Sequence, residues 1–167
     1  LSFFRWLLAF LILFPFTYRA ILNDINIYKK NILLMIVVSI LGVTIFNSFT
    51  YISLQTTMVI NSSLMASITP LLIIGFSWFL FKTKTTSFQF IGIFLSLLGA
   101  FCIISKGNLE NFFNLYFTKG DIWMLVAVFC WGLYSVLLKK IDKSLSQLPT
   151  LEVMIFFGLI FIFPFYF

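Results

Sequence analysis

The chain is built of long apolar stretches that short polar segments separate. From Asn31 to Phe81 no charged residue occurs. A helix that crosses a lipid bilayer needs about 20 mainly apolar residues, so this stretch alone has room for two. The stretches are continuously apolar and do not alternate as the strands of a membrane barrel do. The pattern therefore predicts an all-α fold made of membrane-spanning helices.

We expect six transmembrane helices in a polytopic helical membrane protein. The long uncharged stretch is divided at residues 53–57, its most polar point. The polar segment 19–31 is expected to be a loop. The predicted helices cover residues 2–18, 32–53, 57–81, 87–105, 121–139 and 150–167.

Basic residues predict the orientation of these helices in the membrane, because Lys and Arg favour the cytoplasmic side. The loops after the first, third and fifth helices carry eight of the 11 basic residues, and the remaining segments carry three. The eight are Arg19, Lys29, Lys30, Lys82, Lys84, Lys139, Lys140 and Lys143. We therefore expect these loops in the cytoplasm and both ends of the chain outside. Topology then explains the net charge of +6, and no nucleic-acid partner is expected.

Composition excludes several classes of protein. Of the 167 residues 62% are hydrophobic and 10% are charged, whereas a soluble domain has about 25% charged residues. The sequence has no histidine, so we expect neither a zinc site of the usual kind nor a Ser-His-Asp triad, and no cofactor is predicted. Cys102 and Cys130 both lie in apolar stretches, so a disulfide is not expected.

Both ends of the chain are apolar, and a short motif near the first end recurs near the second. Both lie within apolar segments, at residues 1–6 and 161–167, so we expect a piece of a longer membrane protein. A Phe-Pro-Phe triplet occurs at residues 14–16 and again at 163–165. Among 24 Phe such a match arises by chance about as readily as by duplication. If the repeat is real, the second copy is inverted in the membrane, which is typical of secondary transporters.

Polar side chains inside the apolar stretches mark candidate binding residues, because they are costly in hydrocarbon unless they face a partner or a water-filled cavity. Pro70 lies within a predicted helix, where it removes a backbone hydrogen bond and frees a carbonyl near Ala66. The predicted lining of a substrate path is Asn47, Tyr51, Asn61, Ser63, Thr69, Trp131 and Tyr134.

Amide and hydroxyl groups suit the polar atoms of a substrate, and aromatic rings suit its apolar or cationic parts. The alternative for each of these residues is helix packing, since small and polar side chains also join helices in a membrane. Gly92, Ser96 and Gly99 are assigned to close packing.

Charged side chains are predicted at the helix ends. We expect all the acidic residues in loops or at helix edges, so no carboxylate is predicted deep in the membrane and no coupling ion is assigned. Arg5 is expected to reach the lipid headgroups or to pair with a part of the protein that this sequence lacks; the alternative is recognition of a carboxylate or phosphate at the outer mouth.

Several motifs resemble those of one transporter family. The segment 61–71, with Pro70, resembles the fourth-helix motif of EamA-type members of the drug/metabolite transporter superfamily. Phe3-Phe4-Arg5-Trp6 resembles the start of their second helix. Residues 89–92 with 98–99 resemble their fifth helix, and residues 120–122, 131–134 and 139–140 resemble the start of their second repeat.

The resemblance implies an inner-membrane, multi-pass carrier of about ten helices, built from two inverted repeats. Residues 1–106 would be helices two to five of the first repeat, 107–120 an extracytoplasmic loop, and 121–167 the start of the second repeat. Such carriers move small metabolites such as amino acids, often outward, by alternating access. The implied partners are the solute and the lipid bilayer, and the oligomeric state is not given. The family commonly has Gly-Glu before its fifth helix, where this chain has Lys82 and Thr83.

Two other functions stay open beside a transporter. One is a scaffold or subunit of the membrane that carries no solute. The other is an integral-membrane enzyme, whose chemistry generally needs His, Asp or Glu at the membrane surface. The sequence has no His and only five acidic residues, and both facts weigh against an enzyme.

Overall fold

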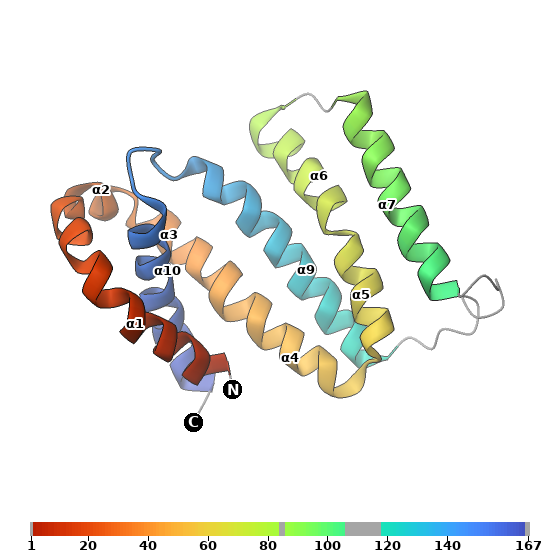
Figure 1. Cartoon of the computed structure of the whole chain (residues 1–167), viewed down its shortest axis with the longest axis horizontal. Helices are drawn as coiled ribbons and strands as arrows, with labels where there is room; N and C mark the ends of the chain where they lie inside the picture. Colours follow the sequence, from red (N-terminus) through yellow and green to blue (C-terminus); the bar gives the residue numbers. More distant parts are fainter. Residues whose placement is uncertain (1, 84–85, 106–117, 166–167) are drawn as a thin grey trace. The chain divides into compact units, whose positions relative to one another are not determined.

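A computed structural model describes residues 2–83, 86–105 and 118–165 of the chain (Figure 1). Every regular element among these residues is helical, which confirms the predicted all-α fold. The chain divides into two compact units. Residues Leu1–Ser48 and Leu137–Phe167 form the first, and Phe49–Val136 form the second.

The first unit packs two N-terminal helices against the last helix of the chain (Figure 1). Helices α1 and α3 both contact α10, and Met35, Val38 and Ile155 are fully buried there. The elements of this unit are α1 (Ser2–Asn23), α2 (Ile25–Lys30), α3 (Ile32–Ser39), the π-helical turn η1 (Ile40–Ile45), the start of α4 (Phe46–Thr56), the 3-10 turns η2 (Leu138–Lys140) and η3 (Phe163–Phe165), and α10 (Gln147–Ile162).

The second unit is held by apolar side chains of α5 (Val59–Ser67) and α9 (Lys119–Leu137). Met65, Met124 and Val128 form its buried cluster, with Leu72 of α6 (Thr69–Phe81) packed against them. The rings of Phe76 and Phe129 meet edge to face with centroids 4.9 Å apart. Helix α7 (Ser87–Ser105) contacts α5, and the rest of α4 completes the unit (Figure 1).

The apolar helices have the dimensions that a membrane requires. Four helical runs are long and apolar enough to cross it: Ser2–Asn23, Ile32–Thr56, Val59–Phe81 and Lys119–Lys140. Two more apolar stretches, Ser87–Gly99 and Gln147–Ile162, are shorter. Large apolar side chains such as Phe16 and Phe88 are exposed, as lipid-facing residues are. Each of the six predicted segments thus coincides with an apolar helical run, in a multi-pass membrane protein.

The segment 19–31 is not the loop that its polar residues predict. Helix α1 continues to Asn23, and α2 begins at Ile25, so one residue interrupts the helix. The Asp24 amide still donates to the Ala20 carbonyl at 3.1 Å. The prediction was wrong because apolar residues recur here at helical spacing: Ile21, Ile25 and Tyr28 all line one cavity of the first unit.

Several helix ends also differ from their predicted positions; for example, α4 ends at Thr56, three residues later than predicted. Helix α9 begins at Lys119, two residues earlier than predicted, and residues 107–117 of the predicted loop lie outside the described residues. Helix α10 begins at Gln147, three residues early, because Pro149 is tolerated in a first turn, where its missing N–H is not needed. At its other end α10 stops at Ile162, and a 3-10 turn carries Pro164.

Close helix packing occurs at a glycine that the sequence did not single out. A side chain at Gly158 would overlap Val43 of η1, and the Thr44 hydroxyl donates to the Gly158 carbonyl at 3.3 Å. Gly92 and Gly99 were expected to pack closely, but in the described part of the chain nothing lies within 4 Å of a Cβ built there.

The end of α6 carries a strained residue. Lys82 has φ 51°, in the left-handed region that favours glycine, and its amide donates to the Trp78 carbonyl at 2.8 Å. This is the position at which the family named above commonly has glycine. The substitution Lys82→Gly should therefore stabilise the fold by about 1 kcal/mol. Thermal unfolding in detergent, followed by circular dichroism, measures the gain.

Lys82→Ala is the matched control, because it removes the same charge and keeps the Cβ. It should leave the midpoint of unfolding unchanged. Equal midpoints for Lys82→Gly and Lys82→Ala would show that strain at this residue is not what limits stability.

Candidate functional site

The predicted lining residues divide between the two units. Asn47 belongs to the first unit, and the other six belong to the second. The contacts of each residue show which of its polar groups are already hydrogen-bonded within the chain.

Asn47 is buried and supports the π-helical turn that precedes it. Its side-chain amide donates to the Gly42 carbonyl at 3.0 Å and to the Val43 carbonyl at 3.1 Å. Its Oδ1 accepts a hydrogen bond from the Arg5 guanidinium, which also lies 5.3 Å from the centre of the Trp6 ring. A π turn interrupts the regular hydrogen-bond pattern of an α-helix. Here the Asn47 side chain donates to two carbonyls of that turn. Arg5 thus bonds within the chain, a partner that the sequence did not predict.

Asn61 takes part in a polar cluster around Asp121. Asp121 is 1% exposed and stands in the first turn of α9. Its carboxylate accepts hydrogen bonds from the Thr57 hydroxyl, the Asn61 side chain, and the backbone and hydroxyl of Thr118. The dipole of a helix N-terminus also favours a carboxylate. The cluster therefore ties the α4–α5 connection to the start of α9.

Gly120 lets these segments approach. A Cβ at this position would stand 2.7 Å from the Ser53 carbonyl oxygen and would also overlap the Thr56 hydroxyl. The Gly-Asp pair at residues 120–121 therefore has two physical roles. The glycine allows the contact and the aspartate bonds across it.

The remaining predicted residues have varied surroundings. Trp131 and Tyr134 are half-buried on α9, and their rings stack with centroids 4.9 Å apart. Tyr51 is half-buried on α4. Ser63 is exposed and donates to the Val59 carbonyl of its own helix at 2.9 Å. The structure thus joins Trp131 to Tyr134 and Asn61 to Asp121.

The helical run around Pro70 is interrupted. Helix α5 ends at Ser67 and α6 begins at Thr69, so that Pro70 falls in the first turn of α6. The Thr69 hydroxyl donates to the Ala66 carbonyl at 2.6 Å. Pro70 has no N–H to donate to the Ala66 carbonyl. The hydroxyl of Thr69, the residue before the proline, takes the place of that donor.

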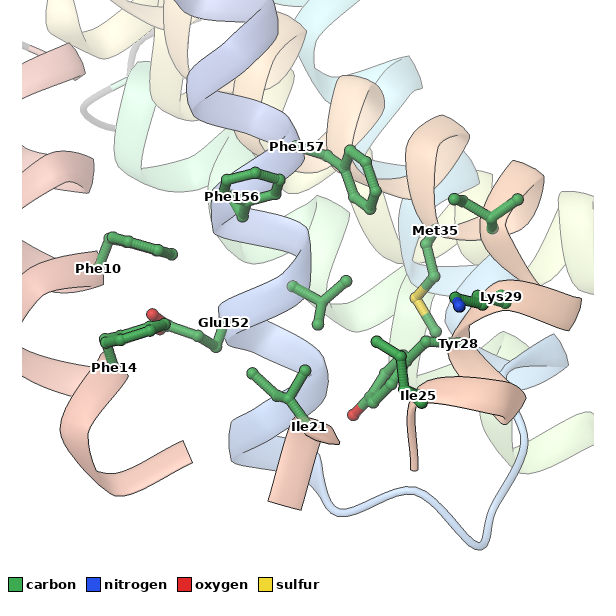
Figure 2. Close-up of a pocket in the computed structure, with 12 residues that line it drawn as sticks. Phe10, Phe14, Ile21, Ile25, Tyr28, Lys29, Met35, Glu152, Phe156 and Phe157 are labelled. Atoms are coloured by element: carbon green, nitrogen blue, oxygen red, sulfur yellow. The ribbon is translucent and has the colours of Figure 1, made fainter. Parts of the chain in front are cut away.

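A buried carboxylate in the first unit escaped the sequence analysis. Glu152 is 1% exposed and lies in the second turn of α10, not at a helix edge as predicted. The predicted start of this helix at residue 150 caused the error, and Pro149 as a first-turn residue was the signal that could have corrected it. Glu152 lines a cavity of about 350 Å³ among α1, α2, α3 and α10 (Figure 2).

Tyr28 also lines this cavity and is itself buried. Its hydroxyl shares a hydrogen bond with Thr150 at 3.2 Å. Burial raises the pKa of the Tyr28 phenol above its usual value, so the hydroxyl stays protonated at physiological pH. Within the described residues no three His, Cys, Asp or Glu side chains gather as metal ligands would.

Comparison with known proteins decides the family. A model of the EamA-like transporter family matches residues 1–105, more than half of the 167 residues. The chain belongs to this family. The resemblance that the sequence motifs carried is therefore confirmed, and the matched residues of the EamA-like chain end with α7.

Curated relatives of this EamA-like chain are named as transporters. The uncharacterized transporter YyaM of Bacillus subtilis is 30% identical over 122 residues, which are 73% of this chain and 40% of that protein. An uncharacterized transporter of Archaeoglobus fulgidus is 31% identical over 129 residues, 77% of this chain and 44% of that protein. The chain thus spans less than half the length of these relatives. No solved structure matches it.

The Asp121 cluster gives a test of the packing in the second unit. Asp121→Asn keeps the shape of the side chain but leaves the Thr118 donors without one carboxylate oxygen. Losing a hydrogen bond to a buried charged group should lower the free energy of unfolding by about 1.5–3 kcal/mol. Unfolding in detergent, monitored by Trp fluorescence, measures the loss.

Asp142→Asn makes the same chemical change at an exposed position, where the carboxylate bonds only Ser144 among the described residues. It should leave stability almost unchanged. Similar losses in Asp121→Asn and Asp142→Asn would contradict a structural role for the buried cluster.

Proposed function

We propose that the protein is a carrier that exports small metabolites, amino-acid-like or related solutes, by alternating access. Family membership gives the class of protein, and the polar groups inside apolar helices support the proposal for this chain. Carriers place substrate sites where helices are irregular and where polar groups are kept away from lipid. The protein is then neither an enzyme nor a passive scaffold.

The observation that carries the proposal is that irregular backbone and polar side chains coincide. In the first unit the π turn at Ile40–Ile45 contains Thr44, and Asn47 bonds its carbonyls. In the second unit the break at Ile68 adjoins Thr69 and Pro70. A helix that served only as a lipid anchor would need neither feature, since regular helices satisfy their own backbone.

The repeat organisation belongs to the same proposal. We assign residues 1–106 to the first repeat and 121–167 to the start of the second, with the connection between them, which ends where α9 begins at Lys119, outside the cytoplasm. The length of the relatives supports this assignment, because the chain covers 40% and 44% of the first two. The helices of the rest of the protein would complete the substrate path in the cell membrane.

Within that path Tyr134 and Trp131 are the residues from which we expect contact with solute. Their stacked rings offer an apolar face with a hydroxyl at its end. Asn47 has a different role in the proposal, because its groups already bond Arg5 and the π turn. We assign it to holding the shape of the path.

Flux measurements on the full-length protein in proteoliposomes test the carrier. Vesicles loaded with unlabelled amino acids should accumulate a radiolabelled one by exchange. Tyr134→Ala should lower the initial rate about tenfold, since a lost aromatic contact of about 1 kcal/mol adds to the lost hydroxyl. The control is Tyr18→Ala, which removes an exposed tyrosine near the end of α1 and should leave the rate unchanged.

The outcomes separate the alternatives. A folded protein that moves no solute of a broad metabolite panel would contradict transport and favour a scaffold. Equal rates in Tyr134→Ala and Tyr18→Ala would keep the carrier and remove Tyr134 from the substrate path.

A further inference from the structure

The cavity of the first unit has the size and lining of a small-molecule site. Its volume of about 350 Å³ lies within the range of ligand pockets, about 300–1,000 Å³. Aromatic and aliphatic side chains make up nearly all of its wall, and Glu152 is the acidic residue among them (Figure 2). None of the lining side chains belongs to the substrate path predicted from the sequence.

The Glu152 carboxylate has no partner among the described residues. Both of its oxygens are buried and neither accepts a hydrogen bond there. Figure 2 shows the side chain extending from α10 toward Phe14 of α1, whereas the amino group of Lys29 lies away from it, across the cavity. A buried carboxylate without a counter-charge is unfavourable, more so within a membrane-spanning helix. A positive group that enters the cavity would supply the missing counter-charge.

The lining decides which kind of cation suits the site. Mg²⁺ and Ca²⁺ take six or more oxygen ligands, and here one carboxylate faces aromatic rings. An organic ammonium ion suits both features, because it pairs with a carboxylate and lies well against aromatic faces. The rings are grouped accordingly: the centroid of Phe10 lies 5.5 Å from that of Phe14 and 6.0 Å from that of Phe156.

We propose that this cavity binds an organic ammonium ion with an apolar body, and that Glu152 supplies its counter-charge. The ammonium group lies between the Glu152 carboxylate and the Phe10 and Phe14 rings. The apolar body lies against the aliphatic wall, which includes Ile21, Ile32 and Met35. Phe14 is 48% exposed, so its ring has room to swing aside and admit the charged group. The proposal concerns binding and is independent of transport.

Binding of phenethylammonium to the full-length protein tests the proposal. Isothermal titration calorimetry in phosphatidylglycerol nanodiscs, with empty nanodiscs subtracted, gives the affinity. Glu152→Gln keeps the shape of the side chain and removes its charge, so affinity should fall by at least about tenfold. The neutral analogue 2-phenylethanol should bind the unaltered protein at least about tenfold more weakly than phenethylammonium does, because it lacks the charge.

Two controls make the result specific. Asp142→Asn removes an exposed acidic charge and should leave the affinity for phenethylammonium unchanged. Glu152→Gln should show the same elution volume and helix content as the unaltered protein. Equal affinity in Glu152→Gln and the unaltered protein, or no binding of phenethylammonium to either, would overturn the proposal.

Lipid is the other source of an ammonium group in a membrane. The titration is therefore repeated in nanodiscs that contain phosphatidylethanolamine. An unchanged affinity supports a free organic ammonium as the ligand. Loss of binding in these nanodiscs would overturn it, because a lipid headgroup would then occupy the cavity.

Discussion

Hydrocarbon offers no hydrogen-bond partner, and this constraint governs the whole chain. Each polar group carried into an apolar helix must be bonded by the protein or matched by a ligand. Asn47 meets the requirement by bonding a π turn and Arg5, and Asp121 meets it by accepting from Thr57 and Thr118. Glu152 does not meet it within the described residues, and this exception is what makes its cavity informative.

The same constraint explains why most of the membrane-spanning helices could be predicted from the sequence. Helices that face lipid must be apolar along their whole length, so the charge-free stretches revealed the spans directly. Family motifs pointed the same way, and the match to the EamA-like family over residues 1–105 confirms them. The segment 19–31 misled because Ile21, Ile25 and Tyr28 recur at helical spacing among its polar residues and line one cavity of the first unit.

The partners of polar groups could not be predicted, because they depend on how helices distant in sequence pack. Arg5 and Asn47 are 42 residues apart, and Tyr28 and Thr150 are 122 apart. Spacing along one helix shows which side chains share a face, but not what faces them. Glu152 was missed for a smaller reason. A start of α10 misplaced by three residues turned a buried carboxylate into one at a helix edge.

Passage of the helices through a bilayer is the central claim, and cysteine accessibility tests it most directly. In a background with Cys102→Ser and Cys130→Ala, the variants Lys30→Cys and Gln55→Cys place one thiol at each end of the helical run Ile32–Thr56. A membrane-impermeant maleimide should label Lys30→Cys only from the cytoplasmic side and Gln55→Cys only from the outside. Labelling of both thiols from the same side of intact membranes would contradict the account.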